Sequence, residues 1–288
     1  MKKVLIIIMC MLSSLCHAQN DFLVFDIGGG INGLKYATDD RGSAKPGVGI
    51  TVRGGYRHFF NKNWGAGINV VFKTCATNCT LDFVETIGDA VDSEGEKYEH
   101  RVCYKSLKEK QSQSNISLPI GVYYRRDIAT NLELTAGAGV LWQTTISNKY
   151  KIADGKVETV GYYAEDNITF DEMPQHDFYN VNNFSGEYEY KNSLGAYGEV
   201  GVAREIGENV FLSLCFYGSY GLATCMEDFT EPVYDYQTMK YIGVLNSEIT
   251  SKKHQIAFGV LIGLRFGLSG SGGGGKGRGH AICPAYSN

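Results

Sequence analysis

Proline, tryptophan and charged residues are all scarce in this chain of 288 residues, which has 5 Pro, 2 Trp and only 20% Asp, Glu, Lys and Arg. Beyond its first 20 residues, no apolar run reaches the roughly 20 residues that a spanning helix needs. The formal net charge of −4 leaves no basic surface for nucleic acid, so we expect no nucleic-acid partner. What the chain does have is 36 Gly, 19 Tyr and 14 Phe, a composition that suits strands alternating between lipid and a packed interior.

The one long apolar run lies at the start of the chain. Two lysines precede an apolar stretch over residues 4–15, and Ala18 offers a small residue for cleavage. About a dozen apolar residues are too few to span a bilayer. We therefore expect residues 1–18 to be a secretory signal peptide cleaved near Ala18. Lipidation at Cys16 is the less favoured alternative, because the preceding leucine is bulky.

Eight segments alternate between apolar residues and small or polar ones, which is the period of a β-strand. In the last segment, for example, Ile262, Leu264 and Phe266 alternate with Gly263, Arg265 and Gly267. Turn-like or polar sequence separates the segments from one another. The expected strands lie at 23–32, 48–57, 64–73, 116–125, 132–142, 191–202, 210–217 and 255–268.

The connections between these segments alternate between short and long. Short ones fall at 61–63, 126–131 and 204–209, and long ones at 36–46, 74–112, 148–188 and 222–252. Short periplasmic turns with long extracellular loops are typical of an outer-membrane barrel, whereas a soluble β-sandwich has no reason to segregate its loops. We expect an all-β fold, a closed antiparallel transmembrane β-barrel over residues 19–268, and a flexible Gly-rich tail over residues 269–288.

The charged residues of the strands fall almost entirely on the set opposite the apolar one. An eight-stranded barrel has an interior that its own side chains just fill. We therefore expect carboxylates and cations to pair inside, which satisfies buried charge and leaves no open pore. The expected interior charges are Asp26, Arg53, Lys73, Glu133, Glu199 and Arg265.

Aromatic residues gather near the short connections, as they do in the girdles of membrane barrels at the bilayer boundary. The residues assigned to this girdle are Tyr56, Phe59, Phe60, Trp64, Tyr123, Tyr124, Phe211 and Phe266.

Residues 117–125 (SLPIGVYYR) and 134–139 (LTAGAG) resemble the porin-family or PorT-like small outer-membrane barrels, which share the eight-stranded architecture of outer-membrane protein A. The resemblance spans roughly residues 22–268. It implies a place in the bacterial outer membrane, in contact with outer-membrane lipid and lipopolysaccharide, and we expect a monomer. It implies no activity and no cofactor. One departure is that Phe266 is followed by about twenty more residues, whereas such barrels often finish at an aromatic residue of the last strand.

Cysteines in the long connections are the most specific chemical feature. Outside the cell thiols oxidise, so we expect disulfides among Cys75, Cys79, Cys103 and Cys225, with Cys79–Cys103 and Cys75–Cys225 as the favoured pairs. Free thiols are one alternative. A zinc site made by Cys75, Cys79, His100 and Cys103 is the other.

Other motifs give weaker evidence for a function. Residues 28–33 fit G-x-G-x-x-G but lack the helix that would hold a pyrophosphate, and residues 270–277 approach a P-loop without its Ser or Thr. His176 beside Asp177 is the best candidate for a hydrolase at the outer rim, where His100 and His254 also fall. Acidic residues of the last two long connections offer oxygen ligands for weak calcium binding, but a solvated surface is the simpler interpretation. These are Asp166, Asp171, Glu172, Asp177, Glu227, Asp228 and Glu231.

The function expected from these patterns is non-enzymatic: a structural or surface-interaction role carried by the long extracellular loops, with a protein or other ligand outside the cell as the partner. The alternatives are a narrow channel for small solutes and a hydrolase at the outer rim. Aromatic side chains of the third long loop offer contact area for a partner. They are Tyr162, Tyr163, Phe170, Phe178, Tyr179 and Phe184.

Overall fold

The structure is a computed structural model, and it describes residues 21–171, 184–235 and 240–268. The expected signal peptide, the C-terminal tail, the His176–Asp177 pair and two of the loop aromatics, Phe178 and Tyr179, lie outside these residues. Within the described ranges, no helix has both the length and the apolar composition to cross a bilayer.

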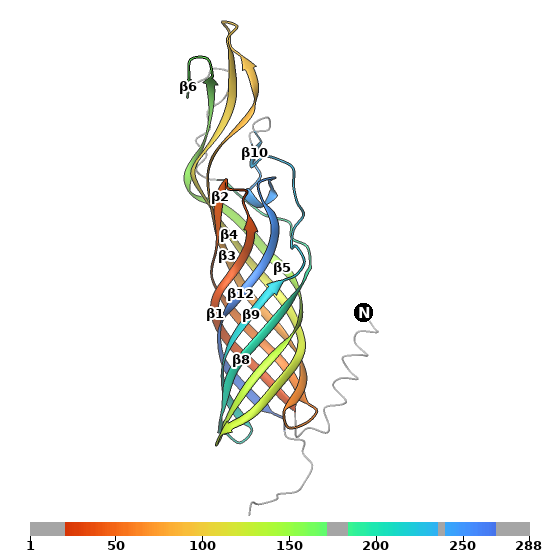
Figure 1. Cartoon of the computed structure of the whole chain (residues 1–288). Coiled ribbons are helices and arrows are strands. Elements are labelled where there is room, and N and C mark those ends of the chain that lie inside the picture. Colours follow the sequence, from red (N-terminus) through yellow and green to blue (C-terminus); the bar gives the residue numbers. More distant parts are fainter. Residues whose placement is uncertain (1–20, 172–183, 236–239, 269–288) are drawn as a thin grey trace, which may run out of the picture.

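Eight long strands form one closed ring (Figure 1). Each pairs antiparallel with two neighbours, and the ring closes where the first strand pairs with the last, from Phe22 opposite Gly267 to Ala37 opposite Ser251. The prediction of an eight-stranded antiparallel barrel is therefore confirmed. The strands are β1 (Asp21–Ala37), β2 (Gly42–Phe59), β3 (Trp64–Val91), β4 (Lys97–Ala129), β5 (Leu132–Tyr163), β8 (Ser193–Gly207), β9 (Val210–Gly221) and β12 (Ser251–Gly267).

Short elements lie in the last two outer connections. They are β6 (Ile168–Phe170), β7 (Ser185–Gly186), β10 (Tyr234–Asp235), β11 (Lys240–Tyr241) and a 3₁₀ helix at Val244–Asn246.

An apolar band surrounds the outside of the barrel. On β12, Phe258 and Ile262 each expose 50% of their surface. At the level of this band, charged residues such as Asp26, Arg53 and Arg265 point inward. This is the reverse of a soluble β-sandwich, whose apolar residues face a second sheet. A continuous apolar band on a closed barrel is instead the surface that faces lipid hydrocarbon. The band also includes Phe25, Ile27, Ile50, Ile68, Val70, Ile120, Val122, Val140, Val200, Leu214 and Phe216.

Two of the connections expected to be long loops are mostly strand. β1 and β2 are joined by the short turn at residues 38–41, and β3 and β4 continue as a hairpin to a turn at residues 92–96, where Gly95 has a φ of 89°. The strand pattern was missed because, beyond the band, both faces of these strands carry polar residues. Figure 1 shows the ends of β3, β4, β5 and β6 rising beyond the rest of the barrel. We call residues 82–106, 156–163 and 168–170 the outer sheet.

The G-x-G-x-x-G residues lie in the middle of β1, and no helix follows them. A Cβ atom on Gly28 would lie 1.9 Å from the backbone oxygen of Val260, and one on Gly30 would lie 2.2 Å from that of Phe258. These glycines allow β1 and β12 to approach closely where the barrel wall curves.

The apolar band predicts that an arginine on it is costly, whereas an arginine at an equally exposed site in water is not. We expect Ile262→Arg, near the middle of the band, to lower the free energy of unfolding by about 2–4 kcal/mol. Val84→Arg is the matched control, since Val84 lies in the outer sheet and is 57% exposed. Urea unfolding from phospholipid vesicles, followed by the fluorescence of Trp64 and Trp142, measures both. Equal effects of the two substitutions would contradict a lipid-facing band.

Candidate functional site

The short-turn end of the barrel interior is filled by aromatic rings and arginines. Phe22, Phe59 and Tyr123 form a buried cluster, with Phe211 packed against it. The Phe22 ring centroid lies 5.7 Å from that of Phe59 and 6.0 Å from that of Phe211. Arginine guanidinium groups lie over these rings, a favourable arrangement for a cation that is shielded from water.

This cluster corrects the expected girdle. Phe59 and Tyr123 are 2% and 1% exposed and point into the barrel, whereas Phe60 and Trp64 are 65% and 51% exposed and point outward. Adjacent strand residues face opposite sides, so Phe59 and Phe60 cannot both join an outer girdle.

An ionic network occupies the next level of the interior. Arg53 Nε donates to Asp26 Oδ2 at 2.7 Å, and its Nη1 donates to Glu199. Arg57 Nη2 donates to the other oxygen of Glu199 at 2.7 Å. Each carboxylate therefore has a cation within hydrogen-bonding distance, which compensates for its removal from water.

The six residues expected as interior charges do face the interior, but they do not all pair. Arg265 pairs with Glu133, and Arg53 joins Asp26 and Glu199. Lys73 is 5% exposed and makes no ion pair with any carboxylate in the described part of the chain. Arg57, which the expected list of interior pairs left out, is the second cation at Glu199. Its position on the same face of β2 as Arg53 was the available signal.

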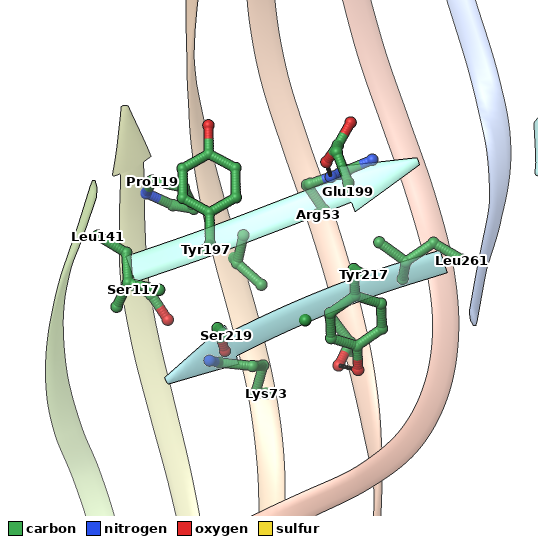
Figure 2. A pocket seen from close by; sticks show the side chains of 13 residues that line it. Arg53, Lys73, Ser117, Pro119, Leu141, Tyr197, Glu199, Tyr217, Ser219 and Leu261 are labelled. Carbon is green, nitrogen blue, oxygen red and sulfur yellow. Dashed lines mark hydrogen bonds and ion pairs between the residues drawn. The ribbon is translucent and has the colours of Figure 1, made fainter. Parts of the chain in front are cut away.

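Lys73 lines a small cavity inside the barrel, next to Arg53 and Glu199 of the ionic network (Figure 2). The cavity has a volume of about 40 Å³, and its wall also includes Ser117, Tyr197, Tyr217 and Ser219. The Ser117 hydroxyl is buried and has no hydrogen-bond partner among the described residues. A space of this size accommodates a few water molecules, but no larger solute.

Replacing Arg53 and replacing Lys73 should have different effects on the free energy of unfolding. Arg53→Met leaves Asp26 and Glu199 with fewer partners, so we expect the free energy of unfolding to fall by about 3–5 kcal/mol. Lys73→Met removes a buried ammonium that has no carboxylate partner, so we expect no loss, or a gain of about 1 kcal/mol. Urea unfolding in lipid vesicles compares them. A loss for Lys73→Met as large as that for Arg53→Met would show that the ammonium has a stabilising partner in the cavity.

A hydrophobic core lies above the barrel at its outer end. It joins residues of β1, β3, β4 and β5 to the connections at 184–192 and 222–250, and we call it the outer core. Its aromatic rings are in close contact: Tyr150 lies 4.5 Å from Tyr188, and Phe184 stacks on Tyr241 at 5.4 Å between centroids. The other buried members include Leu34, Cys79, Leu81, Val102, Tyr104, Leu107, Ile152, Val157, Cys225, Met226, Val233, Tyr234, Val244, Leu245 and Ile249.

Glu109 is buried inside the outer core at 1% exposure. Its Oε1 accepts hydrogen bonds from Tyr188 Oη at 2.5 Å and from Gln111 Nε2 at 2.8 Å. Its Oε2 accepts them from Tyr241 Oη at 2.6 Å and from the backbone N–H of Val244 at 3.0 Å. No cation of the described residues joins this set. Burial raises the pKa of the Glu109 carboxyl above its ordinary value despite the four donors. Sequence reasoning did not single out Glu109, which lies between Lys108 and Lys110 and reads as part of a solvated charge run.

The raised pKa of Glu109 makes the outer core sensitive to pH. A carboxyl whose pKa is higher in the folded state favours folding while it is protonated, so its contribution is full below about pH 4.5 and is lost as the pH rises through the raised value. We expect hydrogen-exchange protection factors for residues 240–250 to fall as the pH rises above about 4.5. Glu109→Gln should remove most of that fall, and the exposed Glu189→Gln should leave it unchanged. Identical pH profiles for wild type and Glu109→Gln would exclude this residue as the cause.

The described cysteines are all free, so the expected disulfides are not supported. Cys79 lies opposite Glu109 in the β3–β4 register, whereas Cys103 lies opposite Val84, five positions further along β3. That separation is about 17 Å along the strand, well beyond the reach of a disulfide. Burial raises the pKa of Cys79 and of Cys225 to about 12, which disfavours the reactive thiolate.

The candidate residues that the structure describes form no metal site, and the His176–Asp177 pair lies outside them. Within the described residues, no three His, Cys, Asp or Glu side chains are placed to hold a metal ion. His254 Nδ1 lies 2.8 Å from the backbone oxygen of Gly221, and its ring stacks on Tyr220. Of the loop aromatics, Tyr163 stacks on Tyr98 and Phe184 on Tyr241, so both serve internal packing.

No protein-family model matches the sequence, and no curated protein matches it. Several solved structures are similar. Neisserial surface protein A (NspA) is 10% identical, with a TM-score of 0.34 over 87% of this chain and 99% of that chain. The outer membrane protein OprG from Pseudomonas aeruginosa is 12% identical, with a TM-score of 0.38 over 86% and 96%. Ail, the attachment invasion locus protein of Yersinia pestis, is 12% identical. Its structure in complex with the heparin analogue sucrose octasulfate matches with a TM-score of 0.31 over 86% of this chain and 100% of that chain. These are small outer-membrane barrels of the kind that the sequence resembles.

Proposed function

We propose that this protein is a non-conducting, non-enzymatic barrel of the bacterial outer membrane, and that its outer sheet makes contact with partners outside the cell. The observation that carries the proposal is a filled interior beneath a large, ordered projection. An aromatic and arginine layer, an ionic network and the outer core occupy successive levels of the barrel. A cavity of about 40 Å³ leaves no path for a solute, so the functional surface is the outer one.

The outer sheet has features of a binding surface. β2 pairs with β3 as far as Gly42 opposite Leu81, and the Asp82 N–H donates to the backbone oxygen of Arg41. From Phe83 to its tip, this edge of β3 pairs with no strand in the described part of the chain. Unpaired strand edges are templates for adding a strand from another chain. Apolar side chains that are exposed on this sheet offer contact area: Val84 57%, Val91 53%, Ile168 45% and Phe170 49%.

Side-chain stacking gives the outer sheet an ordered surface. The Arg101 guanidinium lies 3.6 Å from the centre of the Tyr162 ring, and Tyr98 stacks on Tyr163 at 5.4 Å. Tyr163 Oη also donates to Asp92 in the hairpin turn at 2.8 Å. These contacts join β4, β5 and the hairpin tip, so a partner would meet a preformed surface and the cost of ordering it on binding would be small.

Shortening the outer hairpin tests the proposal. Val84 and Cys103 are opposite in register, so replacing residues 85–102 with Asn-Gly closes the hairpin by a two-residue turn and leaves the barrel intact. We expect cells that display the full chain to gain adhesion to matrix proteins, glycans or other cells, and cells with the shortened chain to lose it. Heat-modifiable gel mobility checks that both chains fold.

Planar-bilayer recording supplies the second measurement. We expect no stable conductance from the full-length mature chain, because its interior is filled. A large stable conductance, together with equal adhesion of the full and shortened chains, would favour a channel and overturn the proposal.

A further inference from the structure

Lysines follow the apolar band on the outside of the barrel. On β1, β2, β4 and β5, the first charged side chain beyond the band on the lipid-facing side is Lys35, Lys45, Lys110 and Lys149, respectively. Lys45 lies an odd number of residues from the outward Val48 and Ile50, and a bulge in β2 between Pro46 and Thr51 shifts the alternation so that Lys45 is also on the outer face. The four strands thus present one sign of charge at the level where the hydrocarbon ends.

Three lysines meet at a groove on the outer face of β4, β5 and β7. Lys110 pairs with Lys151 across β4 and β5, Lys149 lies opposite Ser112, and Lys151 lies opposite Ser185 of β7. The groove has a volume of about 480 Å³, and Glu187 is its one acidic lining residue. None of the three lysines makes an ion pair with any part of the chain that the structure describes.

Lys149 lies at the height of the lipid headgroups, and Lys151, with Lys110 opposite it, lies about 5 Å further out. Ile146 is the last large apolar side chain exposed on β5, at 55%, and Lys149 follows three residues later. At ~3.3 Å per residue and a strand tilt of about 40°, the ammonium stem begins roughly 7–8 Å above the hydrocarbon boundary. The headgroup region is of similar thickness, about 5–8 Å on each side, and a lysine side chain can extend along it.

We infer that this groove, which we call the lysine groove, binds a phosphate group of the lipid A that forms the outer leaflet. Three ammonium groups at the groove outnumber one carboxylate, and ammonium groups bind phosphate oxygens strongly when both are partly shielded from water. The two serine hydroxyls, Ser112 and Ser185, supply neutral donors for the same oxygens. The occupant is a membrane lipid rather than a soluble anion because the groove opens on the wall of the barrel directly above its lipid-facing band. The inference rests on the proposed outer-membrane location, but not on adhesion.

The test compares two triple variants of the full mature chain in a zwitterionic detergent. Lys110→Gln/Lys149→Gln/Lys151→Gln removes the groove charges, and Lys62→Gln/Lys97→Gln/Lys156→Gln removes three lysines elsewhere. Microscale thermophoresis measures the binding of diphosphoryl lipid A and of the same lipid without its phosphates. We expect the groove variant to bind diphosphoryl lipid A about tenfold to a hundredfold more weakly at low salt, and the control variant to bind as wild type does. Removing the lipid phosphates should weaken binding by wild type to a similar extent.

Each other outcome overturns the inference. Equal binding by wild type and the groove variant excludes the groove, and equal weakening of both variants reduces the effect to net charge. Competition by inorganic phosphate as strong as that by lipid A, at equal phosphate concentration, would assign the site to a soluble anion. If the groove variant does not fold, Lys149→Gln alone should bind lipid A about fivefold more weakly. Failure of wild type itself to show heat-modifiable mobility would instead contradict the membrane barrel.

Discussion

Closure of the backbone hydrogen-bond ring is the constraint on which the rest of this structure depends. Within a bilayer, no water satisfies a free strand edge, so a sheet can cross only when its first strand pairs with its last. Here β1 pairs with β12 from Phe22 to Ala37, and glycines such as Gly28 and Gly30 are required because a Cβ atom there would meet the β12 backbone. Once the ring is closed, every second side chain must face lipid and the others must share a narrow interior.

The interior follows from that division. Carboxylates that face inward cannot reach water freely and need cationic partners within the barrel. Arg53 is such a partner for both Asp26 and Glu199. The aromatic layer at the short-turn end and the outer core at the other end then exclude solvent from both sides. Under the proposed function, the filled barrel serves as a support, and the surface that meets partners is the outer sheet.

Much of this architecture was predictable because the two-residue repeat of a β-strand can be recognised in the sequence wherever the two faces of the strand differ in polarity. The eight spanning strands and the inward orientation of Asp26 and Arg53 follow directly from that contrast. Beyond the band the contrast disappears: Gln111 and Gln113 face inward while Lys110 and Ser112 face outward, so the same alternation reads as an irregular polar loop. The pairing of Cys79 and Cys103 failed for a related reason, because a loop permits contacts that a fixed register forbids. Glu109 was missed because its burial depends on Tyr188 and Tyr241, which are distant in sequence.

β4 runs as one continuous strand from the lipid-facing band, through the level of the headgroups, into the outer sheet, and so it links these parts of the molecule. Its outward side chains change from Ile120 at the hydrocarbon to Lys110 at the headgroups, and its inward ones from Tyr123 in the aromatic layer to Glu109 in the outer core. Because one register fixes all of these positions, a slip of one residue would move Glu109 to the outer surface and Lys110 into the core. The barrel therefore sets the height and orientation of the outer sheet, and the lysine groove marks the level at which lipid ends and the exposed surface begins. The outer sheet needs no anchor of its own, since the ring of hydrogen bonds in the membrane already provides one.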